Sequence, residues 1–161
     1  MNLKSSDIVK LLGLIELPEE GGYYSRTYQS PESVELPRGN RALGDAIYYL
    51  ITEDQFSGLH KLKCDEMWHF YAGDPVEMLL FSEDEFQVKE LGNTDFNIHR
   101  PQQLVRANQW QGTKLKAGGK WALIGTNAFP AYDHADFTLG KLEMFNELSA
   151  AQLETVKRYI K

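Results

Sequence analysis

Residues 56–73 read Phe56-Ser57-Gly58-Leu59-His60-Lys61-Leu62-Lys63-Cys64-Asp65-Glu66-Met67-Trp68-His69-Phe70-Tyr71-Ala72-Gly73. No other stretch of the sequence combines polar and aromatic residues so densely. It holds two of the four histidines, two adjacent acids and a tryptophan. Runs of β-prone residues lie within it and around it, so these side chains are predicted to lie on or beside strands. The chemistry of the protein is therefore expected here.

Short apolar and aromatic runs continue on both sides of this segment. They recur at intervals of about 8–12 residues without intervening helices, which is typical of an antiparallel sandwich or barrel. Residues 29–44 are polar and contain two prolines and two glycines, which predicts a long loop. The predicted strands lie in residues 23–28, 46–51, 56–62, 67–71, 76–81, 86–91, 103–107, 121–128 and 137–145.

A helix is predicted at each end of the chain. Apolar residues recur at helical spacing over residues 5–17, and Ser5 or Ser6 can cap that helix. Near the other end, Ser149 and Gln152 fit a capping box before an apolar stripe. These features predict a single domain over residues 1–161, divided into an N-terminal helix in 1–18, a β-barrel in 19–146 and a C-terminal helix in 149–161.

Composition and charge exclude several classes of protein. Lysine and arginine number 17 against 23 acids, for a net charge of −6, which argues against a nucleic-acid partner. The sequence has neither an apolar run of about 18 residues nor a secretory leader, so no membrane partner is expected and the predicted location is the cytoplasm. Aromatic residues make up 12% of the chain; they suit a core and also the wall of a small-molecule pocket.

The opening segment resembles the first sequence motif of the cupin superfamily, G-x5-H-x-H-x3,4-E-x6-G. His60 matches the first histidine, Glu66 the glutamate and Gly73 the closing glycine. Leu62 stands at the position of the second histidine, and Asp54 at that of the leading glycine. The motif thus keeps one of its two imidazoles and its carboxylate.

The similarity extends beyond this motif. The second cupin motif aligns with residues 100–115, where Gln111 takes the place of its histidine. One branch, the uncharacterised cupin-5 family (formerly a domain of unknown function), resembles the chain over about residues 3–145. The matching segments are Glu20-Gly21-Gly22-Tyr23, Ala46-Ile47-Tyr48-Tyr49-Leu50, Phe56-Ser57, the run 65–73, Pro101-Gln102 and Trp110-Gln111.

The resemblance implies an all-β fold. The expected architecture is the cupin double-stranded β-helix, or jelly roll, with short N- and C-terminal helices and pairing as a homodimer. No settled activity comes with the family. Relatives in fold include sugar-nucleotide epimerases, sugar-phosphate isomerases and metal-dependent oxygenases, and the fold alone does not choose among them.

A metal site would be incomplete in this sequence. Cupin metal ions are held by about three histidines and a glutamate, or by two histidines and a carboxylate. Leu62 and Gln111 remove two imidazoles from that set, so the prediction is a pocket without a metal or other cofactor. If a divalent metal does bind, its ligands are expected to be His60, Glu66 and Gln111.

The leading functional hypothesis is a barrel pocket for a small polar molecule, sugar-like or nucleotide-sugar-like. Epimerases of this fold use a barrel histidine as base and a tyrosine as acid, so His60 is the candidate catalytic residue of a metal-independent epimerase or isomerase. The sequence does not select the tyrosine; the candidates are Tyr23, Tyr24, Tyr28, Tyr48, Tyr49 and Tyr71. The residues expected to bind the ligand are Glu66, Trp68, His69, Tyr48, Arg26, Gln102, Trp110 and Gln111.

Other interpretations of the same residues stay open. The protein can instead be a metal-dependent oxygenase using His60 and Glu66, or a ligand-binding module without catalysis. His69 lies three residues after Glu66, which is the opposite face of a regular strand, so a core or interface role is an equal alternative. Arg26 binds an acidic ligand or points to solvent. Cys64 has no neighbouring base and is expected to be a passenger.

Overall fold

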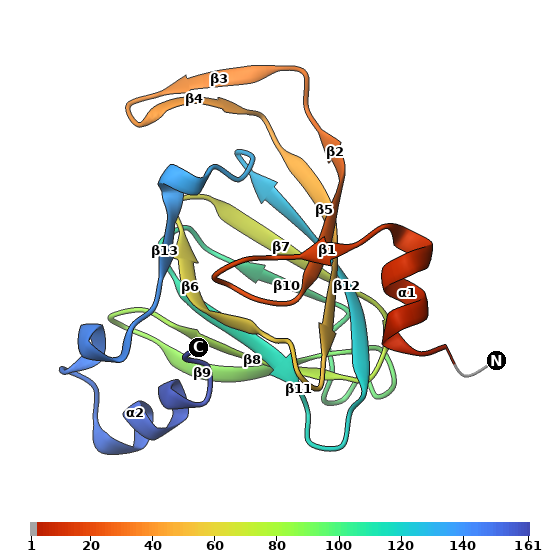
Figure 1. Ribbon diagram of the computed structural model, residues 1–161. Helices are drawn as coiled ribbons and strands as arrows, with labels where there is room; N and C mark the ends of the chain where they lie inside the picture. The colour runs from red at the N-terminus through yellow and green to blue at the C-terminus, as the bar shows by residue number, and fades with distance from the viewer. Residues whose placement is uncertain (1–2) are drawn as a thin grey trace.

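A computed structural model describes residues 3–161 (Figure 1). Two sheets of six and five strands face each other, and a two-stranded hairpin projects beyond them. The larger sheet contains, in spatial order, β1 (Ile15–Glu16), β2 (Tyr23–Gln29), β5 (Asp45–Thr52), β12 (Trp121–Phe129), β7 (Asp65–Gly73) and β10 (Gln102–Val105). The smaller one contains β13 (Phe137–Leu139), β6 (Ser57–Leu62), β11 (Trp110–Leu115), β8 (Val76–Phe81) and β9 (Phe86–Leu91). The predicted all-β jelly roll is confirmed.

Strand β7 shows how the sequence alternates across the barrel wall. It pairs antiparallel with β12 on one side and with β10 on the other. Glu66 and Trp68 are buried and face the barrel interior, whereas His69 between Trp68 and Phe70 is only half-buried. Because side chains alternate along a strand, His69 lies on the outer face of the sheet. The main core between the two sheets includes Tyr49, Ile51, Trp68, Phe70, Met78, Leu80 and Ile124.

The N-terminal helix is shorter than predicted. Helix α1 (Ser5–Leu12) ends at Gly13, whose left-handed conformation (φ 60°) terminates it, and β1 follows in place of further helical turns. The predicted serine cap is wrong. Lys4 is the N-cap residue, and the Asp7 carboxylate accepts its backbone N–H at 3.1 Å. Apolar residues of α1 cover the outer face of the six-stranded sheet around Leu50.

The C-terminal helix begins as predicted. In the capping box of α2 (Ala150–Lys157), the Ser149 hydroxyl accepts the Gln152 N–H at 3.3 Å, and the Gln152 side chain accepts the Ser149 N–H at 3.0 Å. The helix ends at Lys157 rather than at residue 161. The short 3-10 segment η2 (Leu142–Phe145), α2 and the residues after it pack apolar side chains against the outer face of the five-stranded sheet, including Val156 and Tyr159.

The predicted loop over residues 29–44 is wrong, because it contains the hairpin of β3 (Ser33–Leu36) and β4 (Gly39–Ala42). This arm projects from the barrel at the top of Figure 1. The Asp136 carboxylate, in the short 3-10 segment η1 (His134–Asp136), accepts the Nε–H groups of Arg41 at 2.9 Å and Arg38 at 3.1 Å. Because Asp136 is far along the chain from the arm that it holds, residues 29–44 show no local sequence pattern that predicts the hairpin.

Within residues 3–161, no helix combines the length and the apolar character needed to cross a bilayer.

Candidate functional site

A cavity of about 90 Å³ lies inside the barrel. We call it the barrel cavity. Its aromatic walls are Tyr24, Tyr49, Trp68 and Tyr132. Its ionisable lining residues other than tyrosine are Glu20, Arg26, Asp45, His60 and Glu66. It therefore gathers several charges in a small, partly enclosed space.

His60 on β6 is 1% exposed. Its Nδ1 lies 2.8 Å from the carbonyl oxygen of Gly58. A carbonyl only accepts, so Nδ1 carries the proton and donates it. In the neutral ring, Nε2 then holds a lone pair. It lies 3.9 Å from Oε2 of Glu20, beyond hydrogen-bond distance. His60 thus presents a proton acceptor beside the cavity.

Glu20 reaches the cavity from a tight turn between β1 and β2, residues 17–22, which we call the strap. The turn needs three left-handed residues, Glu19 (φ 64°), Gly21 (φ 96°) and Gly22 (φ 74°). A side chain at Gly22 would meet the Tyr49 ring at 2.6 Å, so only glycine fits there. The Tyr49 hydroxyl donates to the Gly21 carbonyl at 2.6 Å and holds the strap against the barrel.

Glu66 lies at the centre of a buried hydrogen-bond network. Its Oε2 accepts the Gln111 side-chain N–H at 2.7 Å and the Trp68 indole N–H at 3.1 Å. The same indole N–H also lies 2.9 Å from Oε1 of Gln111. Burial raises the pKa of Glu66, and the nearby His60 opposes that rise. Gln111 therefore orients the carboxylate from behind and does not itself line the cavity.

Arg26 and Asp45 form a weak pair at one side of the cavity. A guanidinium nitrogen of Arg26 lies 3.8 Å from Oδ2 of Asp45, and the Arg26 side chain is 43% exposed. Asp45 also accepts the backbone N–H groups of Ala128 and Tyr132, each at 3.3 Å. Burial nevertheless raises the pKa of Asp45. The positive charge of Arg26 is thus shared with solvent and with Asp45.

The structure narrows the choice of tyrosine. Of the six candidates, only Tyr24 and Tyr49 line the cavity, and the Tyr49 hydroxyl is engaged with the strap. Tyr132, which the sequence did not single out, lines the cavity too. Its hydroxyl lies 3.2 Å from Nδ1 of His134, and burial raises its pKa to about 12. Tyr24 is therefore a tyrosine hydroxyl available to a ligand, and Tyr132 can also donate to one when its oxygen accepts from Nδ1–H of His134.

Five of the eight expected ligand-binding residues do not line the barrel cavity, so their placement in a common pocket is wrong. Gln111 lies behind Glu66, and the other four lie elsewhere. Tyr48 and His69 alternate with inward residues and face the outside of the six-stranded sheet. Gln102 pairs with His69 in register, and its side-chain nitrogen lies 3.0 Å from Nδ1 of that ring. Trp110 lines a different hollow, on the outside of the five-stranded sheet.

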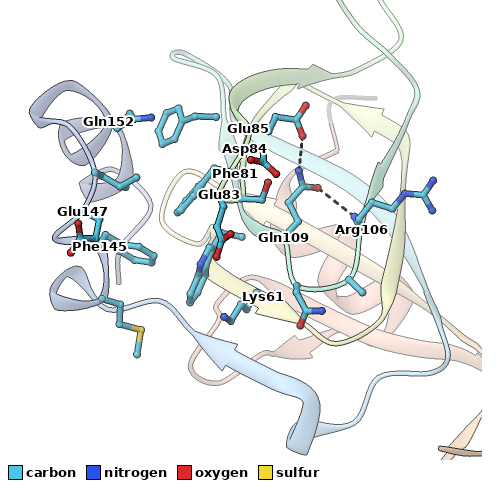
Figure 2. Close-up of a pocket in the computed structure, with 17 residues that line it drawn as sticks. Lys61, Phe81, Glu83, Asp84, Glu85, Arg106, Gln109, Phe145, Glu147 and Gln152 are labelled. Carbon is cyan, nitrogen blue, oxygen red and sulfur yellow. Dashed lines mark hydrogen bonds between the residues drawn. The ribbon is translucent and has the colours of Figure 1, made fainter.

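This outer groove has a volume of about 980 Å³ and is shown in Figure 2. It runs between the β8–β9 turn and the C-terminal segment, with Phe81, Trp110 and Phe145 in contact on its floor. The Lys61 ammonium lies 4.7 Å from the Trp110 ring centre. The groove is larger than the barrel cavity, but its acids are exposed and it has no histidine. The concentration of buried ionisable groups favours the barrel cavity as the functional site.

The donor groups of the barrel do not fit the usual cupin metal. Leu62 lines the cavity at the position of the second motif histidine, and both ends of the Gln111 amide bond Trp68 or Glu66. Within residues 3–161, no group of three or more His, Cys, Asp or Glu side chains is arranged to hold a metal ion.

Sequence reasoning missed Glu20 as a site residue, together with Asp45 and Tyr132. The available signal for Glu20 was its place in the family-like segment Glu20-Gly21-Gly22-Tyr23, where paired glycines mark a tight turn. Cys64, in contrast, is buried, and burial raises the pKa of its thiol to about 12. This agrees with its predicted passenger role, since the thiolate is the reactive form.

Two facing antiparallel sheets around a polar cavity define the class of double-stranded β-helix proteins. Solved structures share this architecture. A hypothetical protein from Leishmania major superposes with a TM-score of 0.90 at 25% identity, covering 98% of this chain and 99% of that one. A protein from Shewanella oneidensis gives a TM-score of 0.88 at 28% identity, covering 99% and 98%. An oxalate decarboxylase variant from Bacillus subtilis, with a TM-score of 0.56 at 12% identity and coverage of 92% and 35%, shares the fold alone.

The chain belongs to the cupin-5 family. That family, described as Cupin superfamily (DUF985), matches residues 6–140. No curated protein matches the sequence. The match establishes the fold and the family, and the activity has to be argued from the site.

Proposed function

We propose that the barrel cavity binds a small polar molecule and that His60 acts on it as a general base, without a metal. The reaction class that fits is isomerisation or epimerisation at a carbon next to a carbonyl. The observation that carries this proposal is the state of His60. The Gly58 carbonyl holds the proton on Nδ1, and this leaves the basic Nε2 beside the cavity and Glu20.

The steps assigned to the protein are simple. Nε2 of His60 removes the proton from the carbon, and Glu20 stabilises the imidazolium that forms, because an opposite charge nearby favours it. A hydroxyl of Tyr24 or Tyr132 donates a hydrogen bond to the oxygen on which negative charge develops. For isomerisation, the imidazolium delivers the proton to the neighbouring carbon while the hydroxyl proton there moves to the former carbonyl oxygen. For epimerisation, a tyrosine hydroxyl on the other side of the ligand gives a proton to the opposite face of the same carbon, and solvent later restores both side chains. Neither reaction consumes or needs an oxidant.

The size of the cavity limits the ligand. A volume of about 90 Å³ is well below the roughly 300–1,000 Å³ of pockets for drug-sized ligands. This favours a molecule with few heavy atoms over a nucleotide sugar. A second hollow of about 210 Å³ shares Leu17, Glu20 and Tyr132 with the cavity. A larger, sugar-like ligand would have to extend past these three side chains.

Proton exchange in heavy water tests the catalytic part. The protein is incubated with small 2-hydroxy and 2-amino carbonyl compounds, and loss of the C–H signal is followed by ¹H NMR. We expect enzyme-dependent exchange that falls by about 100-fold or more in His60→Gln, the usual scale of general acid–base catalysis. The control variant His69→Gln, changed on the outer face, should catalyse the exchange as fast as wild type. Binding without exchange would favour the non-catalytic module, the second candidate.

Metal analysis separates the oxygenase alternative. We expect no stoichiometric iron, manganese or nickel in the purified protein. Metal that is present in wild type and lost in His60→Ala would overturn the metal-free proposal.

The homodimer and the cytoplasmic location also remain proposals. Support for the dimer comes from the outer face of the six-stranded sheet and its margin, where Tyr28, Tyr71 and Phe129 are 57%, 48% and 53% exposed. Exposed aromatic side chains are enriched at protein–protein interfaces. Light scattering should give twice the monomer mass, and Tyr71→Asp should shift it toward the monomer mass.

A further inference from the structure

The charges around the barrel cavity do not balance. Asp45 is offset by Arg26 and by two backbone N–H groups. Glu20 and Glu66 receive hydrogen bonds only from neutral groups, such as the Ser57 hydroxyl at 2.7 Å from Glu20. Arg26 is the fixed positive charge of the wall, and its nearest acid is Asp45 at 3.8 Å. Among the lining residues that the structure describes, only a protonated His60 would add a second positive charge beside Glu20 and Glu66. With a neutral ring, two carboxylates therefore face the cavity without a full counter-charge.

The hydrogen-bonding character of the wall points the same way. Nε2 of neutral His60 accepts, and ionised Glu20 and Glu66 are acceptors only. His60 lines the cavity and its Nε2 lies 3.9 Å from Oε2 of Glu20, beyond hydrogen-bond distance, so this nitrogen can accept a hydrogen bond from a ligand. A bound molecule has to bring donors to these three groups.

Aromatic faces complete the lining. Tyr24, Tyr49 and Trp68 border the same space, and the negative faces of aromatic rings attract cations. A carboxylate or phosphate would instead place its charge against two acids.

We infer that the ligand of the barrel cavity is a small primary amine, bound as its ammonium ion between Glu20 and Glu66. An ammonium offers three donors and no acceptor, which matches the acceptor-rich wall. This inference rests on the proposed location of the site and narrows its ligand to one charge class. Glu20 and burial both disfavour the charged form of Glu66, and a bound cation relieves that repulsion.

Three two-carbon compounds test the charge class directly: ethanolamine hydrochloride, ethylene glycol and sodium glycolate. They are similar in size and differ in charge. The reporter is the Trp68 indole N–H in ¹⁵N NMR, because this group hydrogen-bonds Glu66. Trp68→Phe assigns its signal, and Trp121, packed near α1, serves as the internal control. Spectra are recorded at neutral pH and constant ionic strength.

We expect ethanolamine alone to shift the Trp68 signal saturably, with Trp121 unmoved. Glu20→Gln should weaken that binding by about tenfold or more, the usual scale for removing a charged hydrogen-bond partner. The matched control is Glu19→Gln, which removes the same charge one residue away, from a side chain outside the cavity.

The outcomes separate the two proposals. Saturable shifts from ethylene glycol or glycolate without ethanolamine binding would overturn the amine inference and leave the barrel site standing. If Glu19→Gln and Glu20→Gln weaken ethanolamine binding equally, the role of Glu20 is overturned. If no small polar compound moves Trp68, while binders move Trp110 in the outer groove, both the inference and the proposed site are wrong.

Discussion

At the residue scale, the site depends on a histidine whose two nitrogens have different surroundings. Nδ1 is fixed by a carbonyl two residues away, and Nε2 faces Glu20. His60, Glu66 and Trp68, which the sequence singled out from the motif segment, line the cavity, and their roles stay predictions. Glu20 was missed because no local period places a turn residue inside a barrel, and its family-like segment marks only a tight turn.

Glu66 should make the stability of the protein depend on pH. Its pKa is higher in the folded chain than in the unfolded chain, so the folded state binds the proton more tightly. Its contribution to the free energy of unfolding is therefore largest at low pH and falls as pH rises from about 4.3, the ordinary glutamate pKa, to the raised value.

Denaturant unfolding of wild type and Glu66→Gln across this pH range measures the effect. As pH rises, the free energy of unfolding of the variant should increase relative to that of wild type. The total increase should be about 1.4 kcal/mol for each unit by which the folded and unfolded pKa values of Glu66 differ. Other acids, such as Asp136 with its lowered pKa, are common to both proteins and cancel. A constant difference between the two proteins would contradict this account.

Cys64 should be inert in the folded protein. It is buried, and its thiol pKa is raised to about 12, so thiolate is scarce near neutral pH. At pH 8, a disulfide reagent should label Cys64 when the protein is placed in denaturant, and the labelling rate should then equal the rate of unfolding. The native protein should stay unlabelled. Rapid labelling of the native protein would show that this part of the barrel opens readily.

At the element scale, the strap is the part on which the site depends most. Gly22→Ala should cost about 2–4 kcal/mol of folding free energy, because it combines a left-handed backbone with overlap on the Tyr49 ring. Gly118→Ala is the matched control: its φ of 87° is also left-handed, but no atom lies within 4 Å of an added side chain. It should cost only about 1–2 kcal/mol. Equal costs by denaturant unfolding would mean that the Tyr49 contact is unimportant.

The arm formed by β3 and β4 depends on Asp136. Asp136→Asn removes the negative charge that Arg38 and the buried Arg41 share. We expect a fall of several degrees in the unfolding midpoint and faster hydrogen exchange in residues 33–42. The sequence missed this arm because its anchor is far along the chain, whereas the α2 cap was predictable from four adjacent residues.

At the scale of the whole molecule, two hollows compete as the functional site. Figure 2 shows the larger one outside the barrel, and the smaller one contains the buried His60 and Glu66. Size is the poorer guide to the functional site here, because chemistry needs ionisable groups shielded from water. The composition predicted that aromatic residues would line a pocket, and they line both hollows. Trp68 borders the cavity and Trp110 borders the groove.

The most direct test is a ¹⁵N NMR screen of small polar molecules that follows the indole signals of these two tryptophans. The account predicts binders that shift Trp68 and leave Trp110 unmoved, with the shift lost in His60→Gln and kept in His69→Gln. Binders that shift only Trp110, or that bind His60→Gln as tightly as wild type, would contradict it.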